Sequence, residues 1–123
     1  MEIFVKKYLN RLQAISKNII YQFMNNKIKH CTPCTSVDHP LNSEIAKQKL
    51  IGLNDWQLID DGRKIKKNFK FKDFITTLNF VNKVGNIAEI EGHHPDIFFT
   101  WGKCTIEIYT HTINGLHDND FIL

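Results

Sequence analysis

Hydrophobic residues recur at helical spacing in the first part of the chain. Between residues 3 and 28 they mostly follow one another every three or four positions, with lysine and arginine around them. This spacing predicts an amphipathic helix, whose apolar stripe contains Val5, Tyr8, Leu9, Leu12, Ile15, Ile19 and Phe23. Three roles are open to it: packing on its own domain or an oligomer partner, lying on a membrane surface, or acting as a targeting leader.

A linker, a short helix and a hairpin are predicted next. Residues 29–41 contain two prolines, which indicates an irregular linker. Asn42-Ser43 is a helix start signal, and the short helix that follows is expected to end near Gly52. Residues 56–59 and 64–71 alternate between apolar and polar positions on either side of a turn signal, which predicts two antiparallel strands.

The following hydrophobic stripe has helical spacing again. Asp73 is suited to cap a helix, and five positions after it repeat at intervals of four, three, four and three. This spacing predicts a helix that lies on a sheet through its stripe, whose members are Phe74, Leu78, Val81, Gly85 and Ala88. Glu89 would then lie in the last turn of this helix, just before two adjacent histidines.

Residues 97–101 and 104–111 predict a second hairpin around Gly102-Lys103. His111 would project from the face opposite the helices, or from the end of its strand. Side chains alternate along a strand, so three apolar residues of the second strand should share the face that meets the helices: Cys104, Ile106 and Ile108.

The order of these elements predicts the fold class. A helix, a hairpin, a second helix, a second hairpin and a helix start near Asp118 suit an α+β fold. Such a fold has a four-stranded antiparallel sheet with helices packed on one face, plus here an extra N-terminal helix. Residues 1–40 are expected to form a basic leader and linker, and residues 41–123 the domain. Because a free strand edge is a liability in a lone monomer, we expect a homodimer or homotetramer.

Composition and charge narrow the function classes. A chain of 123 residues with 42% hydrophobic content suits one small domain with a single core. The formal charge of +3 divides into +4 for residues 1–40 and −1 for residues 41–123, so we expect no direct binding of nucleic acid by the domain. No apolar run approaches the roughly 18 residues of a membrane span. We therefore expect a cytoplasmic protein, with organelle targeting by the leader left open.

The cysteines indicate no framework of disulfides. Their number, three, is odd. Cys31 and Cys34 form a CxxC motif that His30 and His39 could extend to a Cys2His2 set, but this spacing fits no zinc template, and a reduced pair is expected. Cys104 begins an alternating strand and is expected in the core.

Side chains with acid–base chemistry gather between residues 89 and 120. Four of the six histidines lie here, and adjacent His93 and His94 precede Pro95, which favours extended backbone at His94. If both open a strand, their side chains point to opposite faces, while the hairpin folds His111 back toward them. Imidazoles exchange protons near neutral pH, so this is a candidate acid–base site. Its candidate residues are Glu89, His93, His94, Trp101, His111 and Asp120.

The pattern Glu-x3-His-His-Pro-x5-Trp-x9-His-x8-Asp resembles the signature of the pterin-4a-carbinolamine dehydratases. The resemblance extends upstream to Trp56 and residues 69–74 and downstream to Gly115-Leu116, and it covers about residues 41–123. It implies the α+β fold predicted above, in members that associate into dimers and tetramers. It also implies dehydration of a 4a-hydroxytetrahydropterin to the quinonoid dihydropterin, which recycles the cofactor of aromatic amino acid hydroxylases.

With this chemistry, the histidines take distinct expected roles. His93 would act as the general acid at the 4a-hydroxyl, with His111 as its proton-transfer partner. His94 would hold the pterin ring or share the acid role. Glu89 would orient His93 and stabilise its charge.

The two remaining candidates have alternative roles. Trp101 would wall the pocket beside the flat pterin ring, or lie in the core. Asp120 would hold a histidine or the pterin amide, or only cap the final helix. The reaction needs neither a redox cofactor nor a metal ion, so no cofactor is expected.

Two other function classes are open. A metal-dependent hydrolase could use His93, His94 and His111, but adjacent histidines diverge on a strand and the HxxxH spacing of a helical zinc site is absent. The second class is a non-catalytic binding module, since some members of the family also bind a homeodomain transcription factor and stabilise its dimer. Turnover of a pterin carbinolamine distinguishes these classes.

Overall fold

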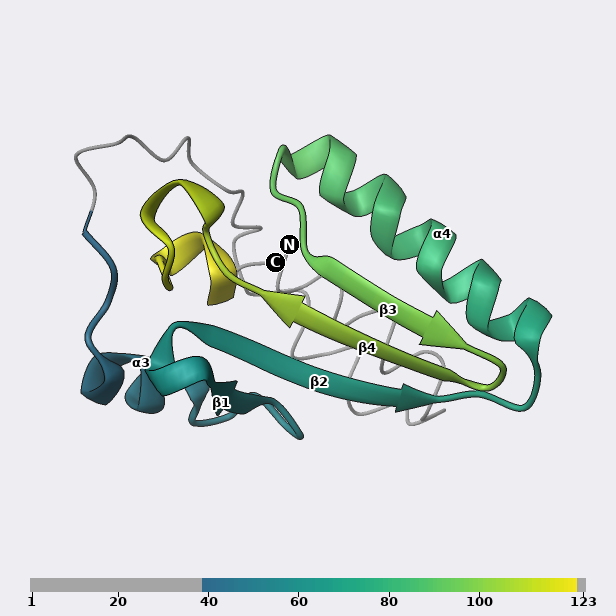
Figure 1. The fold of residues 1–123 in the computed structure, drawn as a ribbon, viewed down its shortest axis with the longest axis horizontal. Coiled ribbons are helices and arrows are strands. Elements are labelled where there is room, and N and C mark those ends of the chain that lie inside the picture. Colours follow the sequence, from purple (N-terminus) through teal and green to yellow (C-terminus); the bar gives the residue numbers. More distant parts are fainter. Residues whose placement is uncertain (1–38, 122–123) are drawn as a thin grey trace, which may run out of the picture.

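The computed structural model of the chain describes residues 39–121 (Figure 1). The predicted helix over residues 3–28 and the Cys31/Cys34 pair lie outside these residues. The described part contains two α-helices, α3 (Ser43–Leu50) and α4 (Phe74–Glu91). Its strands are β1 (Gln57–Ile59), β2 (Lys64–Lys70), β3 (Asp96–Thr100) and β4 (Lys103–Ile108).

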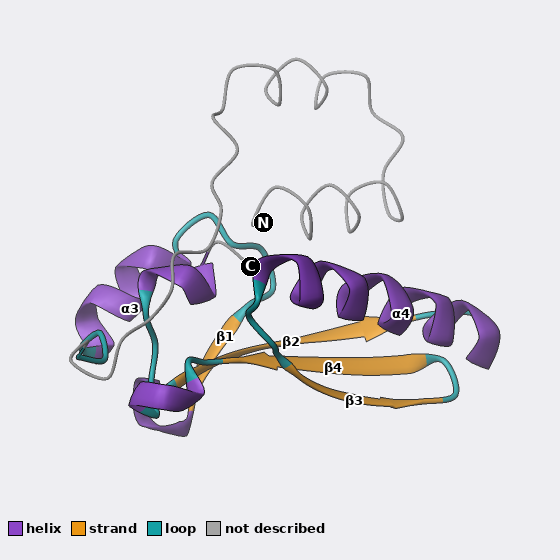
Figure 2. Cartoon of the chain, turned by 90° about the horizontal axis from the view of Figure 1, so that it is seen from above, coloured by secondary structure: helices purple, strands orange, loops and turns teal. Residues whose placement is uncertain are grey.

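The four strands of the described part form one antiparallel sheet in the order β1-β2-β4-β3. Both predicted hairpins are present, β1 with β2 and β3 with β4, and the pairing of β2 with β4 joins them. Helix α4 lies along one face of this sheet (Figure 2), and Ala46 of α3 belongs to the same core. The predicted α+β fold is confirmed.

Helix α4 begins where Asp73 caps it. The Asp73 carboxylate accepts a hydrogen bond of 2.8 Å from the backbone N–H of Thr76, a donor that the first turn of a helix leaves free. The hydrogen bonds from Thr76 hold the pKa of the Asp73 carboxyl below its usual value, because they stabilise its charged form. The predicted start of this helix is therefore confirmed.

The buried face of α4 is rotated from the predicted one. Phe74, the first member of the predicted stripe, is 46% exposed. Phe80 sets the orientation instead, because its ring lies 4.9 Å from the rings of both Phe69 and Phe71. One position along a helix corresponds to a turn of about 100°, so the predicted stripe was wrong by one residue over most of its length. The buried residues are Thr77, Phe80, Val84, Ile87 and Ala88.

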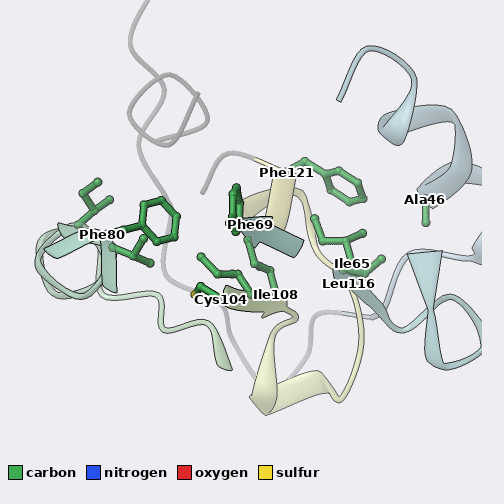
Figure 3. Close-up of a cluster of buried hydrophobic side chains, with 11 residues drawn as sticks. Ala46, Ile65, Phe69, Phe80, Cys104, Ile108, Leu116 and Phe121 are labelled. Carbon is green, nitrogen blue, oxygen red and sulfur yellow. The ribbon is translucent and has the colours of Figure 1, made fainter. Parts of the chain in front are cut away.

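The core lies between the helices and the sheet (Figure 3). Across β2 and β4, Ile65 pairs with Ile108 and Phe69 with Cys104, so the apolar side chains of both strands share one face. Burial raises the pKa of the Cys104 thiol to about 11, because the interior disfavours the thiolate. The predicted inward face of β4 is confirmed, since its three members are buried: Cys104, Ile106 and Ile108.

The chain beyond β4 departs from the predicted strand and helix. The strand was predicted to reach His111, but β4 ends at Ile108, and residues His111–Ile113 form a short 3-10 helix, η2. Thr110 and Gly115 form an isolated bridge around this helix. The final helix predicted near Asp118 is a 3-10 helix, η3 (Asp118–Phe121).

Three segments meet at one end of the sheet as a result. The link from α4 leads into the start of β3, and Asp96 of β3 lies opposite Glu107 near the end of β4. The segment that follows β4 begins at the same end, because β3 and β4 are antiparallel. This end of the sheet carries the histidines.

Candidate active site

Adjacent His93 and His94 lie in the link between α4 and β3. Gly92 adopts the left-handed conformation (φ 61°), which ends the helix. The backbone N–H of His93 then donates to the carbonyl oxygen of Ala88 at 3.1 Å. The two histidines precede β3, which begins at Asp96, so the condition that both open a strand is not met.

A buried carboxylate holds His93. Its Nε2 lies 2.6 Å from Oδ1 of Asp120, and the two side chains are 11% and 0% exposed. Because a carboxylate can only accept hydrogen bonds, pairing with an ionised Asp120 places a hydrogen on Nε2. Within residues 39–121, Nδ1 of the same ring has no hydrogen-bond partner. Every buried side-chain nitrogen or oxygen of these residues does have a partner, so Nδ1 is not one of the buried atoms. Nδ1 is therefore the ring nitrogen available to a bound molecule.

Both oxygens of Asp120 are occupied. Oδ1 faces His93, and Oδ2 accepts hydrogen bonds from the Thr110 hydroxyl (2.9 Å) and the backbone N–H of His117 (2.7 Å). These bonds compensate for the loss of hydration that burial causes. With its side chain fully buried, Asp120 can orient a histidine but cannot contact a ligand in this conformation.

Glu89 pairs with His94 and not with His93. Oε1 of Glu89 lies 2.7 Å from Nε2 of His94, and the side chains are 78% and 58% exposed. The prediction that Glu89 orients His93 is wrong, because His93 turns inward to Asp120 and leaves its neighbour on the outside. Solvent screens this exposed pair, so it contributes little to stability.

His111 has a carboxylate partner of its own. Its Nε2 lies 3.4 Å from Oδ1 of Asp96, with the two side chains 53% and 35% exposed. The His111 ring also lies 4.2 Å from the ring of Tyr109, over which Lys64 places its Nζ at 4.4 Å. His111 is thus held beside the sheet while its side chain stays open to solvent.

A series of contacts and one peptide bond connects His93 with His111, and His94 adjoins His93 in the chain. From His93 the contacts lead to Asp120, to Thr110 and its neighbour His111, and from His111 to Asp96. Each imidazole has its own carboxylate, so the site contains three pairs able to give and take protons. Sequence reasoning missed Thr110 and Asp96 as site residues. For Asp96 one signal was available, namely the alternation of side chains along the strand that begins with Asp96, which lies opposite Glu107.

Trp101 lies at the other end of β3. It follows Thr100, which pairs with Lys103 next to the turn into β4, and its side chain is 65% exposed. The five residues of β3 span about 17 Å between the two ends. The structure therefore brings Trp101 neither to the histidines of its own chain nor into the core.

Two further observations concern the described residues as a whole. Within residues 39–121, no three His, Cys, Asp or Glu side chains are placed so that they could hold one metal ion. Neither α3 nor α4 combines the length and the apolar character needed to cross a membrane.

A family model described as pterin 4 alpha carbinolamine dehydratase matches residues 39–123. The chain belongs to this family. It is 48% identical over 95 residues to a protein of Methylococcus capsulatus that is provisionally named a pterin-4-alpha-carbinolamine dehydratase, across 77% of this chain and 83% of that one. A protein of Aromatoleum aromaticum with the same provisional name is 50% identical over 93 residues, across 76% and 83% of the two chains.

A solved structure shares the fold. It is the crystal structure of a transcriptional coactivator/pterin dehydratase from Brucella melitensis, with a TM-score of 0.61 and 32% sequence identity. The match covers 68% of this chain and 88% of that one. The family predicted from the histidine pattern is confirmed.

Proposed function

We propose that this protein dehydrates a 4a-hydroxytetrahydropterin to the quinonoid dihydropterin by histidine general acid–base catalysis. The observation that carries the proposal is the 2.6 Å contact of His93 with the fully buried Asp120, in a cluster with two further imidazoles. Membership of the family supports the substrate class.

The reaction removes one molecule of water. His93 donates a proton from Nδ1 to the 4a-hydroxyl, because hydroxide leaves poorly until it is protonated. The C–O bond breaks, water departs, and a pterin ring nitrogen loses its proton as the C=N double bond forms. His111 accepts that proton, so the two histidines exchange their protonation states in one turnover. Asp120 keeps the hydrogen of His93 on Nε2 and the ring in a fixed orientation.

His94 and Glu89 have a different role in this proposal. Their exposure at the edge of the cluster suits contact with the pterin ring as it enters the site. His94 would hold the ring or share the acid role, and Glu89 would orient His94. The product, a quinonoid dihydropterin, places the reaction in the recycling of the cofactor that aromatic amino acid hydroxylases use.

The test is a dehydration assay on the purified full chain. The rate of dihydropterin formation should exceed the uncatalysed rate, and His93→Ala should lower kcat by about 10²-fold. His39→Ala is the matched control, since His39 is exposed and outside the cluster, and it should keep the wild-type rate. A wild-type rate equal to the uncatalysed one, or equal losses in the two variants, would contradict the proposal.

Self-association is part of the proposed function. Within the described residues β3 is an edge strand, and its Phe98 and Phe99 are 58% and 42% exposed. An edge with exposed aromatic residues favours pairing with a second copy, so we expect a homodimer or homotetramer. A concentration-independent monomer mass in light scattering would count against it.

A binding role beside catalysis is the second candidate. The Brucella melitensis protein of the same fold is described as both a transcriptional coactivator and a pterin dehydratase. Capture of a transcription factor by a chain that does not turn over a pterin carbinolamine would favour the binding role over the catalytic one.

A further inference from the structure

We propose that Thr110 is a positioning residue for the dehydration, which acts by holding Asp120 in the orientation that fixes the His93 ring. The proposal rests on the proposed function for its kinetic consequence, but its geometric content stands on the described contacts alone. Thr110 lies outside the motif residues and is 4% exposed, so it does not contact substrate.

The side chain of Thr110 controls one oxygen of the carboxylate. Its hydroxyl donates to Oδ2 of Asp120 at 2.9 Å, while Oδ1 faces His93 at 2.6 Å. A carboxylate can rotate about its bond to the Cβ atom, and rotation would carry Oδ1 away from the imidazole. Two donors on Oδ2, the hydroxyl and the backbone N–H of His117, oppose this rotation.

The backbone of Thr110 is fixed independently of its side chain. Its N–H donates to the carbonyl oxygen of Gly115 at 2.9 Å, and its carbonyl oxygen accepts from the N–H of Gly115 at 3.4 Å. Gly115 in turn lies so close to Pro40 that an added Cβ would sit 2.7 Å from the Pro40 Cβ. The hydroxyl therefore sits on a backbone that cannot easily shift when the side chain changes.

Thr110 also precedes His111, the proposed proton-transfer partner. Its side chain points inward to Asp120, while that of His111 is 53% exposed. Thr110 therefore supports His93 through Asp120, and its backbone continues directly into His111. Loss of the hydroxyl should loosen His93 without removing any group that a pterin touches.

Kinetics give the first part of the test. Thr110→Val keeps the shape and removes the donor, and it should lower kcat by about tenfold while KM changes by less than about twofold. Thr110→Ser restores the hydroxyl and should restore the rate. Thr77→Val is the matched control, because Thr77 is equally buried and its hydroxyl donates to the carbonyl oxygen of Asp73 far from the site. It should keep the wild-type kcat.

Nuclear magnetic resonance gives the second part, which does not depend on turnover. Long-range proton–nitrogen spectra of the full chain show which nitrogen of His93 carries the hydrogen, with His93→Ala used for assignment. At a pH where the His93 ring is neutral, wild type and Thr110→Ser should show hydrogen on Nε2 alone, and Thr110→Val should show a mixture of tautomers or a broadened Nε2–H signal.

The outcomes separate the two proposals. No turnover by the wild type, with the expected change in the His93 spectrum, would remove the dehydratase role and keep the positioning role of Thr110. An unchanged His93 spectrum and an unchanged kcat in Thr110→Val would overturn the positioning role, as would a kcat loss that Thr110→Ser fails to restore. Thr110→Ala repeats the test if the valine variant does not fold.

Discussion

Two neighbouring histidines have carboxylate partners at nearly the same distance but in opposite surroundings. Nε2 of His93 lies 2.6 Å from Asp120, and Nε2 of His94 lies 2.7 Å from Glu89. The first pair is 11% and 0% exposed, whereas the second is 58% and 78% exposed. The two pairs therefore differ in their burial and not in their contact distances.

Burial changes what each pair can do. An exposed ion pair is screened by water and typically contributes about 0–1 kcal/mol. A buried carboxylate must be hydrogen-bonded on all sides, and removal of its partner is costly because a charge is left uncompensated. The His93–Asp120 pair therefore holds one geometry, while the His94–Glu89 pair can rearrange around a ligand.

The largest expected difference between the pairs is in stability. Asp120→Ala leaves the His93 ring, the Thr110 hydroxyl and the His117 N–H without their acceptor, and should lower the free energy of unfolding by about 3 kcal/mol. Glu89→Ala should lower it by less than about 1 kcal/mol. Urea unfolding of both variants measures the difference, and equal losses would show that burial does not distinguish the two pairs.

The next expected effect is on the rate. His93→Ala and His111→Ala should each lower kcat by about 10²-fold, the usual loss for an acid or base group. The double variant should be little worse than the worse single one, because groups on one proton pathway fail together. Fully multiplicative losses, with circular dichroism unchanged, would show that the two histidines act in separate steps.

A smaller effect is expected at the exposed pair. His94→Ala should raise KM by about threefold or more and leave kcat within about twofold, because a group that binds the ring equally throughout the reaction affects binding only. Steady-state kinetics with varied pterin concentration measure both constants. A kcat loss as large as that of His93→Ala would assign His94 to the acid role instead.

A further effect tests burial on a group far from the site. The pKa of the Cys104 thiol is about 11 in the folded chain against an ordinary value of 9.0. Between these values the folded state binds more protons than the unfolded state, so the free energy of unfolding should fall as pH rises from 9 to 11. Cys104→Ala should make the decline shallower in urea titrations across this window. An identical slope in both proteins would show that the thiol does not contribute.

The fold was predictable because it depends on patterns that repeat. Alternation placed Cys104 on the inner face of β4, and the cap signal at Asp73 marked the start of α4. The buried stripe of α4 was missed because the helix is apolar on more than one side, and only contact with Phe69 and Phe71 selects the face of Phe80.

The sequence predicted which residues form the site better than it predicted which of them contact one another. The spacing identified the histidines and Asp120, but it paired Glu89 with the wrong histidine. That pairing depends on the left-handed turn at Gly92, which directs His93 inward. The support from Thr110 depends on a bridge between segments that no motif describes.

The assignment of proton transfer to the buried pair is tested most directly by two isosteric variants in one dehydration assay. Asp120→Asn removes the charge beside the buried His93, and Glu89→Gln removes the charge beside the exposed His94. We expect kcat to fall by about 10²-fold or more in Asp120→Asn and to stay within about threefold of the wild type in Glu89→Gln. Equal losses, or a larger loss in Glu89→Gln, would contradict the assignment.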